Sequence, residues 1–162
     1  MIRLQNVCLN YDGGPNILDN IDLALDEGSF HFLTGPSGAG KTSLLKLIFL
    51  AHRPSAGQLC LFGQNVTKLT RAQLSMMRRQ IGVVFQDFRL IDHLSVYQNV
   101  TLPLRIAGKR EAAYRDNVIE LLRWVGLGHQ MDTKPETLSG GEKQRAAIAR
   151  AVIALSLIHI SE

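Results

Sequence analysis

The N-terminal part of the chain has the alternation of short strands. Apolar and polar residues partly alternate over residues 2–9, as in a half-buried strand. A second strand is predicted over residues 17–25, because a turn signal at 26–28 follows it directly. Three further segments are short, apolar and rich in β-prone side chains, and they are predicted to be strands: 29–34, 59–62 and 81–85.

Helical periodicity accounts for much of the rest of the chain. Leucine and isoleucine side chains give residues 41–50 a broad apolar face, which predicts a helix packed on a sheet. A second helix is predicted over residues 69–80. From 95 to 124 the periodicity is again helical, with breaks expected at Pro103 and Gly108. Strands followed by this helical middle section predict an α/β core with a helical subdomain inserted at about residues 88–140.

Composition and charge restrict the class of protein. With 162 residues, of which 46% are hydrophobic, the chain can form one globular domain with a real core, which excludes disordered and collagen-like classes. The net charge of +4 suits a protein that binds polyphosphate or lies near an anionic membrane. No block of five like charges occurs, and we expect no nucleic-acid partner.

Neither end of the chain has the features of a targeting segment or a membrane anchor. The first residues mix polar and apolar side chains, unlike a signal peptide, so a cytoplasmic location is expected. The longest apolar run, residues 151–158, is too short to span a bilayer. Any association with the membrane is therefore expected to be peripheral and to depend on a partner.

The strongest chemical signal is a glycine-rich loop between the predicted strand at 29–34 and the helix at 41–50. Its residues are Gly35, Pro36, Ser37, Gly38, Ala39, Gly40, Lys41 and Thr42, followed by Ser43. Glycines at these positions allow successive N–H groups to point inward and hold a phosphate at a helix N-terminus. Lys41 is expected to contact the β- and γ-phosphates, and the Thr42 hydroxyl to bind Mg²⁺. The loop predicts ATP binding, in a fold of the P-loop NTPase type.

Two other side chains are candidates for the same site. Tyr11 ends the first predicted strand, where it can stack on a base, although a tyrosine that covers the core is an alternative. Gln86 follows the predicted strand at 81–85, at the edge of the sheet where ligands bind in α/β folds. The alternative for Gln86 is an ordinary solvent-facing glutamine.

A second phosphate-reading motif, Leu138-Ser139-Gly140-Gly141-Glu142, lies farther along the chain. Ser139 is a good N-cap for an alanine-rich helix, and two glycines let the backbone N–H groups approach a phosphate closely. A chain with two such motifs is expected to share nucleotide with a second copy of itself.

In order and spacing, Tyr11, the loop, Gln86 and the second motif resemble the nucleotide-binding domains of ABC transporters. The resemblance covers nearly the whole chain, to about residue 154. Within the family, residues 85–90, 93–100 and 102–104 are most similar to the cell-division ATP-binding proteins. ATPases of lipoprotein-release or macrolide-export transporters are the nearest alternative.

The resemblance implies a homodimer that binds ATP and Mg²⁺ between its subunits. Ser139, Gly140 and Gly141 of one subunit would contact the ATP held by the loop of the other. Gln86 would join Mg²⁺ and the attacking water, and with Lys41 it would be a catalytic residue. Residues 87–92 would touch an integral membrane partner, although a solvated loop is the alternative.

The end of the chain departs from the family's pattern. In the family an apolar strand ending in Asp-Glu follows the signature helix, and a switch histidine comes later, but here Ser161 stands where Asp is needed. We expect a C-terminally truncated domain over residues 1–154 and a tail of separate origin over 155–162, to which His159 belongs. A one-residue shift that makes Glu162 catalytic is the alternative. The chain itself is expected to bind ATP with little or no hydrolysis.

Overall fold

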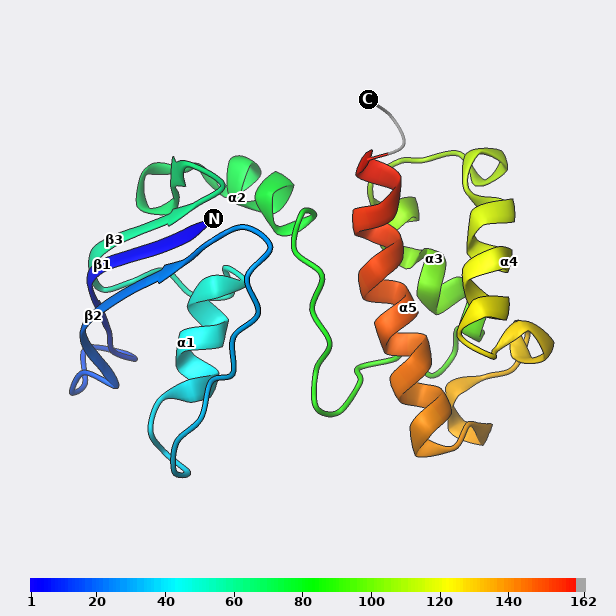
Figure 1. Cartoon of the computed structure of the whole chain (residues 1–162), viewed down its shortest axis with the longest axis horizontal. Helices are drawn as coiled ribbons and strands as arrows, with labels where there is room; N and C mark the ends of the chain where they lie inside the picture. The colour runs from blue at the N-terminus through cyan, green and yellow to red at the C-terminus, as the bar shows by residue number, and fades with distance from the viewer. Residues whose placement is uncertain (160–162) are drawn as a thin grey trace. The chain divides into compact units, whose positions relative to one another are not determined.

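The computed structural model describes residues 1–159, with residues 154 and 156–159 described by their backbone alone (Figure 1). The chain forms two compact units, Met1–Arg78 and Arg79–Glu162. The predicted tail extends past the described residues: helix α5 continues to His159, whereas Ser161 and Glu162 lie outside them.

The N-terminal unit contains one antiparallel sheet with the strand order β2-β1-β3-β4. Its strands are β1 (Ile2–Leu9), β2 (Leu18–Leu25), β3 (Ala56–Leu61) and β4 (Gln64–Asn65). Leu4 of the central strand pairs with Leu23 of β2 on one side and with Leu59 of β3 on the other. Leu4 and Leu59 are both buried, so the sheet is held by apolar contacts as well as by its hydrogen bonds.

Two helices and a short 3-10 turn complete this unit. They are α1 (Lys41–Ile48), η1 (Val66–Lys68) and α2 (Arg71–Arg78). Figure 1 shows α1 next to the sheet, with Leu44 and Leu47 buried. The guanidinium of Arg78 donates two hydrogen bonds to the carbonyl oxygen of Leu50, which fastens the end of α2 to the segment after α1.

The described residues of the C-terminal unit form the α-helices α3 (Val96–Ile106), α4 (Arg115–Trp124) and α5 (Gly140–His159). Short 3-10 turns connect them: η2 (Glu111–Ala113), η3 (Gly128–Gln130) and η4 (Pro135–Thr137). Ser95 caps the start of α3 with a capping box. Its side chain accepts a hydrogen bond from the Gln98 N–H, and the Gln98 side chain accepts one from the Ser95 N–H.

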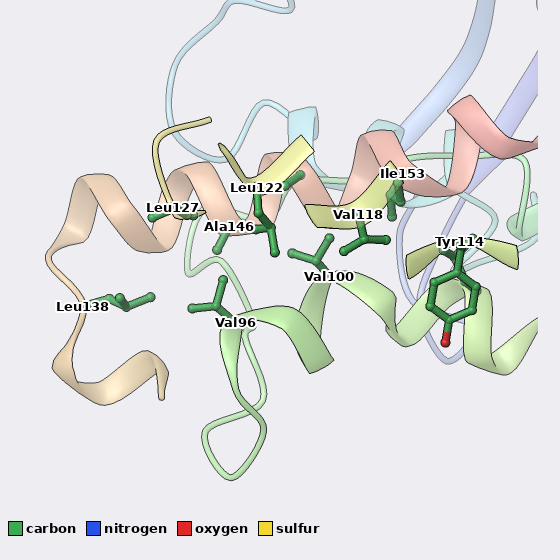
Figure 2. Close-up of a cluster of buried hydrophobic side chains, with 11 residues drawn as sticks. Val96, Val100, Tyr114, Val118, Leu122, Leu127, Leu138, Ala146 and Ile153 are labelled. Atoms are coloured by element: carbon green, nitrogen blue, oxygen red, sulfur yellow. The ribbon is translucent and has the colours of Figure 1, made fainter. Parts of the chain in front are cut away.

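One buried cluster holds these helices together (Figure 2). The residues recur at helical spacing on each helix and include Val96, Val100 and Leu104 of α3, Val118 and Leu122 of α4, and Ala146, Ala149 and Ile153 of α5. Alanines on α5 allow its backbone to approach the larger side chains of α3 and α4 closely. None of the helices in the described part of the chain combines the length and apolarity needed to cross a bilayer.

Two of the predicted strands are wrong. Residues 29–34 and 81–85 have no strand assignment, and Phe30 and Phe32 are 82% and 83% exposed. The reason is physical: a strand exists only as a member of a sheet, and neither segment belongs to the four-stranded sheet of the described residues. The predicted break at Pro103 is also wrong, because α3 continues through it to Ile106.

Candidate phosphate-binding site

The end of the glycine-rich loop is fixed by Gly40, the residue immediately before α1. Its backbone is left-handed, with φ 85° and ψ 5°. A Cβ atom at this position would lie 2.8 Å from Leu18 Cδ2 and 3.2 Å from the carbonyl oxygen of Ile17. Both the conformation and the close approach to β2 therefore require glycine. A residue with a Cβ atom at position 40 would therefore disturb the junction between the loop and α1.

The Lys41 side chain folds back onto the start of the loop. Its ammonium donates to the carbonyl oxygens of Gly35 at 2.7 Å and Pro36 at 2.6 Å, which uses two of its three protons. The first turn of α1 carries no acidic residue, so no carboxylate of that turn competes for the helix N-terminus. The result is a positive charge and a helix N-terminus at one end of a short loop, which is the arrangement that binds phosphate.

Thr42 and Ser43 occupy the first turn of α1, but they have different surroundings. Thr42 is exposed, as its predicted role as a Mg²⁺ ligand requires. Ser43 is half-buried, and its Oγ accepts a hydrogen bond from the hydroxyl of Tyr11 at 3.2 Å. Hydroxyl oxygens are ligands that Mg²⁺ accepts together with phosphate oxygens and water, so Thr42 fits this ion.

Tyr11 packs against side chains of α1 and the segment after it. Its ring meets His52 edge-on at a centroid distance of 5.1 Å, and the Lys46 ammonium lies 5.8 Å from its centroid. The ring is half-buried. These contacts agree with a tyrosine that covers the core, and the predicted stacking on a base stays a prediction.

The second motif forms the start of α5. The Glu142 carboxylate accepts from the backbone N–H of Ser139 and from its hydroxyl, both at 2.7 Å, and Ser139 Oγ lies 3.4 Å from the Glu142 N–H. This is a capping box, and it agrees with the N-cap predicted for Ser139. Gly140 and Gly141 follow as the first residues of the helix, and a Cβ atom at Gly140 would meet nothing within 4 Å.

Gln130 contacts this motif, and the sequence did not predict the contact. Its Nε2 donates to Glu142 Oε1 at 2.7 Å, whereas its own Oε1 is buried with no hydrogen-bond partner among the described residues. The hydrogen bonds from Ser139 and then from Gln130 lower the pKa of Glu142 to about 2. Because Gln130 lies twelve positions before Glu142, no sequence periodicity indicated the contact.

Gln86 and the residues after it form a tight turn in the C-terminal unit. Gln86 is exposed. The Arg89 guanidinium lies over the Phe85 ring at 4.2 Å and 3.3 Å from the Asp87 carboxylate. The phosphate loop belongs to the N-terminal unit, whereas Gln86 and Ser139 belong to the C-terminal unit. Their predicted joint contact with nucleotide and Mg²⁺ therefore stays a prediction.

A chain with this fold and this loop is a nucleotide-binding cassette, and comparison with known proteins gives its family. The chain belongs to the ABC transporter family, whose sequence profile matches residues 18–160. A solved dimeric structure of a bacterial ABC transporter cassette superposes with a TM-score of 0.85 at 37% identity. The superposition covers 95% of this chain and 70% of that one. The predicted fold class is confirmed.

Relatives with different names are about equally similar. The cell division ATP-binding protein FtsE of Escherichia coli is 44% identical over 153 residues, which are 94% of this chain and 69% of that protein. The methionine import ATP-binding protein MetN of Photobacterium profundum is 41% identical over 150 residues, 93% of this chain and 44% of that protein. The chain thus spans less than half of the second relative, and neither name is singled out.

Proposed function

We propose that the chain is the ATP-binding subunit of an ABC-type membrane complex, of the cell-division kind that FtsE represents. The observation that supports ATP binding is the position of Lys41, whose ammonium lies over the loop at hydrogen-bond distance from Gly35 and Pro36. An arriving phosphate would replace these carbonyls as the partner of the ammonium. The N–H groups at the start of α1 would bind the same phosphate.

Hydrolysis in the proposed complex follows from charge stabilisation at the γ-phosphate. The Thr42 hydroxyl would hold Mg²⁺, which would supply positive charge against the negative charge of the γ-phosphate during its transfer to water. Lys41 would stabilise the same negative charge from the loop, and Gln86 would contact Mg²⁺ and orient the attacking water. These are the roles proposed for this chain's residues in the ATPase reaction.

The second motif is proposed to act on the ATP of another subunit. Gly140 and Gly141 are the first residues of α5 and follow Ser139 directly, so that the helix N-terminus would lie at a γ-phosphate bound there. The solved cassette that this chain resembles is dimeric, which supports a homodimer. Residues 87–92 are proposed to contact an integral membrane partner, FtsX-like if the cell-division assignment is right, so that the subunit is cytoplasmic and peripheral.

Methionine import is the second candidate, because the identity to MetN is nearly the same as the identity to FtsE. Lipoprotein release and macrolide export are further transporter functions for such a cassette. The identity of the membrane protein that co-purifies with the intact subunit would separate these alternatives. We propose no nucleic-acid partner for any of them.

The test of ATP binding is titration of the chain with a fluorescent ATP analogue and Mg²⁺. Lys41→Ala is expected to weaken binding at least tenfold, because the loop loses its only ammonium. Lys68→Ala removes the same charge from η1 and is the matched control, with unchanged affinity expected. Equal affinity in the Lys41 variant and the wild type would contradict the proposal.

A further inference from the structure

Arg150 connects helix α5 to the segment that follows Gln86. Its Nη1 donates to the carbonyl oxygen of Arg89 and its Nη2 to the carbonyl oxygen of Phe88, both at 2.7 Å. The partners are more than sixty positions away in sequence. A planar guanidinium can bind two adjacent carbonyl oxygens at once, which a lysine ammonium on its flexible stem cannot do with the same geometry.

The backbone that receives these bonds is in an uncommon conformation. Phe88 and Arg89 have φ values of 58° and 45°, so two consecutive residues with side chains are left-handed. The Cβ atom makes this conformation unfavourable for each of them. Such a conformation persists only where surrounding contacts hold it. The two hydrogen bonds from Arg150 are made to the carbonyls of these same two residues.

The charge of Arg150 has no acidic partner in the part of the chain that the structure describes. The side chain is about half-buried, and this burial lowers the pKa of its guanidinium. Backbone carbonyls thus compensate the positive charge. A guanidinium on the surface would keep its hydration, whereas partial burial removes part of it. The position of Arg150 against these carbonyls therefore indicates that its role is to hold the backbone in place.

The same segment is attached at two further points. Before Gln86, a Cβ atom at Gly82 would lie 2.8 Å from the carbonyl oxygen of Ala151, so the segment runs closely against α5 there. After it, the fully buried Asn99 of α3 accepts from the Ile91 N–H and donates to the Ile91 carbonyl oxygen. Residues 86–91 are therefore held between α5 on one side and α3 on the other.

We propose that Arg150 is a positioning residue that fastens residues 86–91 to α5, so that a displacement of this segment moves the helix whose first turn carries the second motif. The fastening stands on the hydrogen bonds alone. The attachment would transmit movements between a membrane partner and Ser139, and this part of the proposal rests on the proposed function. Arg150 itself touches neither nucleotide nor reacting atoms in this scheme.

The test is amide hydrogen exchange of the whole chain, read by mass spectrometry in the absence of nucleotide. In Arg150→Gln, exchange over residues 86–91 is expected to rise about tenfold, because the segment loses both hydrogen bonds to α5. Exchange in α3 and α4 should stay unchanged. Arg150→Lys should give an intermediate result, since it keeps the charge but not the paired geometry. Arg105→Gln, at an exposed position at the end of α3, is the control and should match the wild type.

The second arm adds Mg²⁺ and ATP. In the wild type, nucleotide should change exchange over 86–91, and Arg150→Gln should abolish that change while binding nucleotide with equal affinity. Unchanged exchange in nucleotide-free Arg150→Gln would overturn the fastening. If the wild type binds ATP without any change over 86–91, transmission is overturned. Failure of the wild type to bind ATP would contradict the proposed function, and the nucleotide-free comparison would still decide on Arg150.

Discussion

Ser139 donates its hydroxyl proton to the carboxylate of Glu142, at 2.7 Å, while its backbone N–H binds the same oxygen. A hydroxyl has one proton to give. In this conformation Ser139 can accept a hydrogen bond but cannot donate one to a phosphate. A γ-phosphate that binds here therefore has to compete with Glu142, and Gln130 holds this carboxylate in place.

The first prediction concerns the stability of the chain at low pH. Glu142 has a pKa of about 2 in the folded chain instead of the ordinary 4.5, so its contribution to stability is complete above about pH 4.5 and is lost as the pH falls towards 2. Glu142→Gln keeps a capping-box side chain that does not titrate. Urea unfolding between pH 5 and pH 2, followed by circular dichroism, should show this loss in the wild type and less of it in the variant. Equal pH dependence would refute the assignment.

The second prediction concerns Gly40→Ala. The methyl group has to occupy a left-handed position and to displace Leu18, so a loss of at least about 1–2 kcal/mol of unfolding free energy is expected, together with weaker nucleotide binding. Gly13→Ala is the matched control, because φ there is 74° but nothing lies within 4 Å of the added Cβ. Chemical denaturation compares the two, and a Gly40 variant no less stable than the Gly13 variant would remove the close contact from the explanation.

The third prediction concerns alkali. Burial and the hydrogen bond that Tyr97 donates to Glu111 raise the pKa of Tyr97 to about 12. The neutral phenol is thus favoured in the folded state, and its contribution to stability is complete below the ordinary value of 10 and is lost as the pH rises through about 12. Ultraviolet titration of the wild type minus Tyr97→Phe isolates this group. Glu111→Gln should lower the pKa of Tyr97. An equal pKa in the wild type and in Glu111→Gln would contradict the contribution of Glu111.

The fourth prediction concerns Asn99→Leu. The side-chain amide makes hydrogen bonds to the carbonyl oxygens of Ile91, Leu94 and Ser95 and accepts one from the Ile91 N–H. Leucine fills a similar volume but removes these side-chain hydrogen bonds and leaves the Ile91 N–H without its acceptor, at a cost of about 1–3 kcal/mol. Asn117→Leu, on an exposed face of α4, should change stability by less than about 0.5 kcal/mol. Urea midpoints of both variants measure the contrast, and equal midpoints would show that Asn99 is dispensable.

Features that depend on neighbouring residues could be predicted from the sequence. The glycine loop, the start of α1 after Gly40 and the cap at Ser139 all follow from contacts within a few positions. Such contacts form wherever the local backbone allows them. They include most of the candidate site.

Features that depend on distant partners could not be predicted. Residues 81–85 have the composition of a buried strand, but composition does not provide the neighbour that a strand needs. Arg150 stands in an alanine-rich helix without any spacing that relates it to Phe88. The contact of Arg150 with residues 88–89 follows from the fold and not from the sequence around either segment.

The buried cluster of Figure 2 draws all its members from α3, α4, α5 and the turns between them. The sheet of the N-terminal unit has its own buried leucines, Leu4 and Leu59 among them. Each half of the chain thus has a core made from its own residues. A thermal scan therefore has to be analysed without assuming that one melting temperature describes both halves.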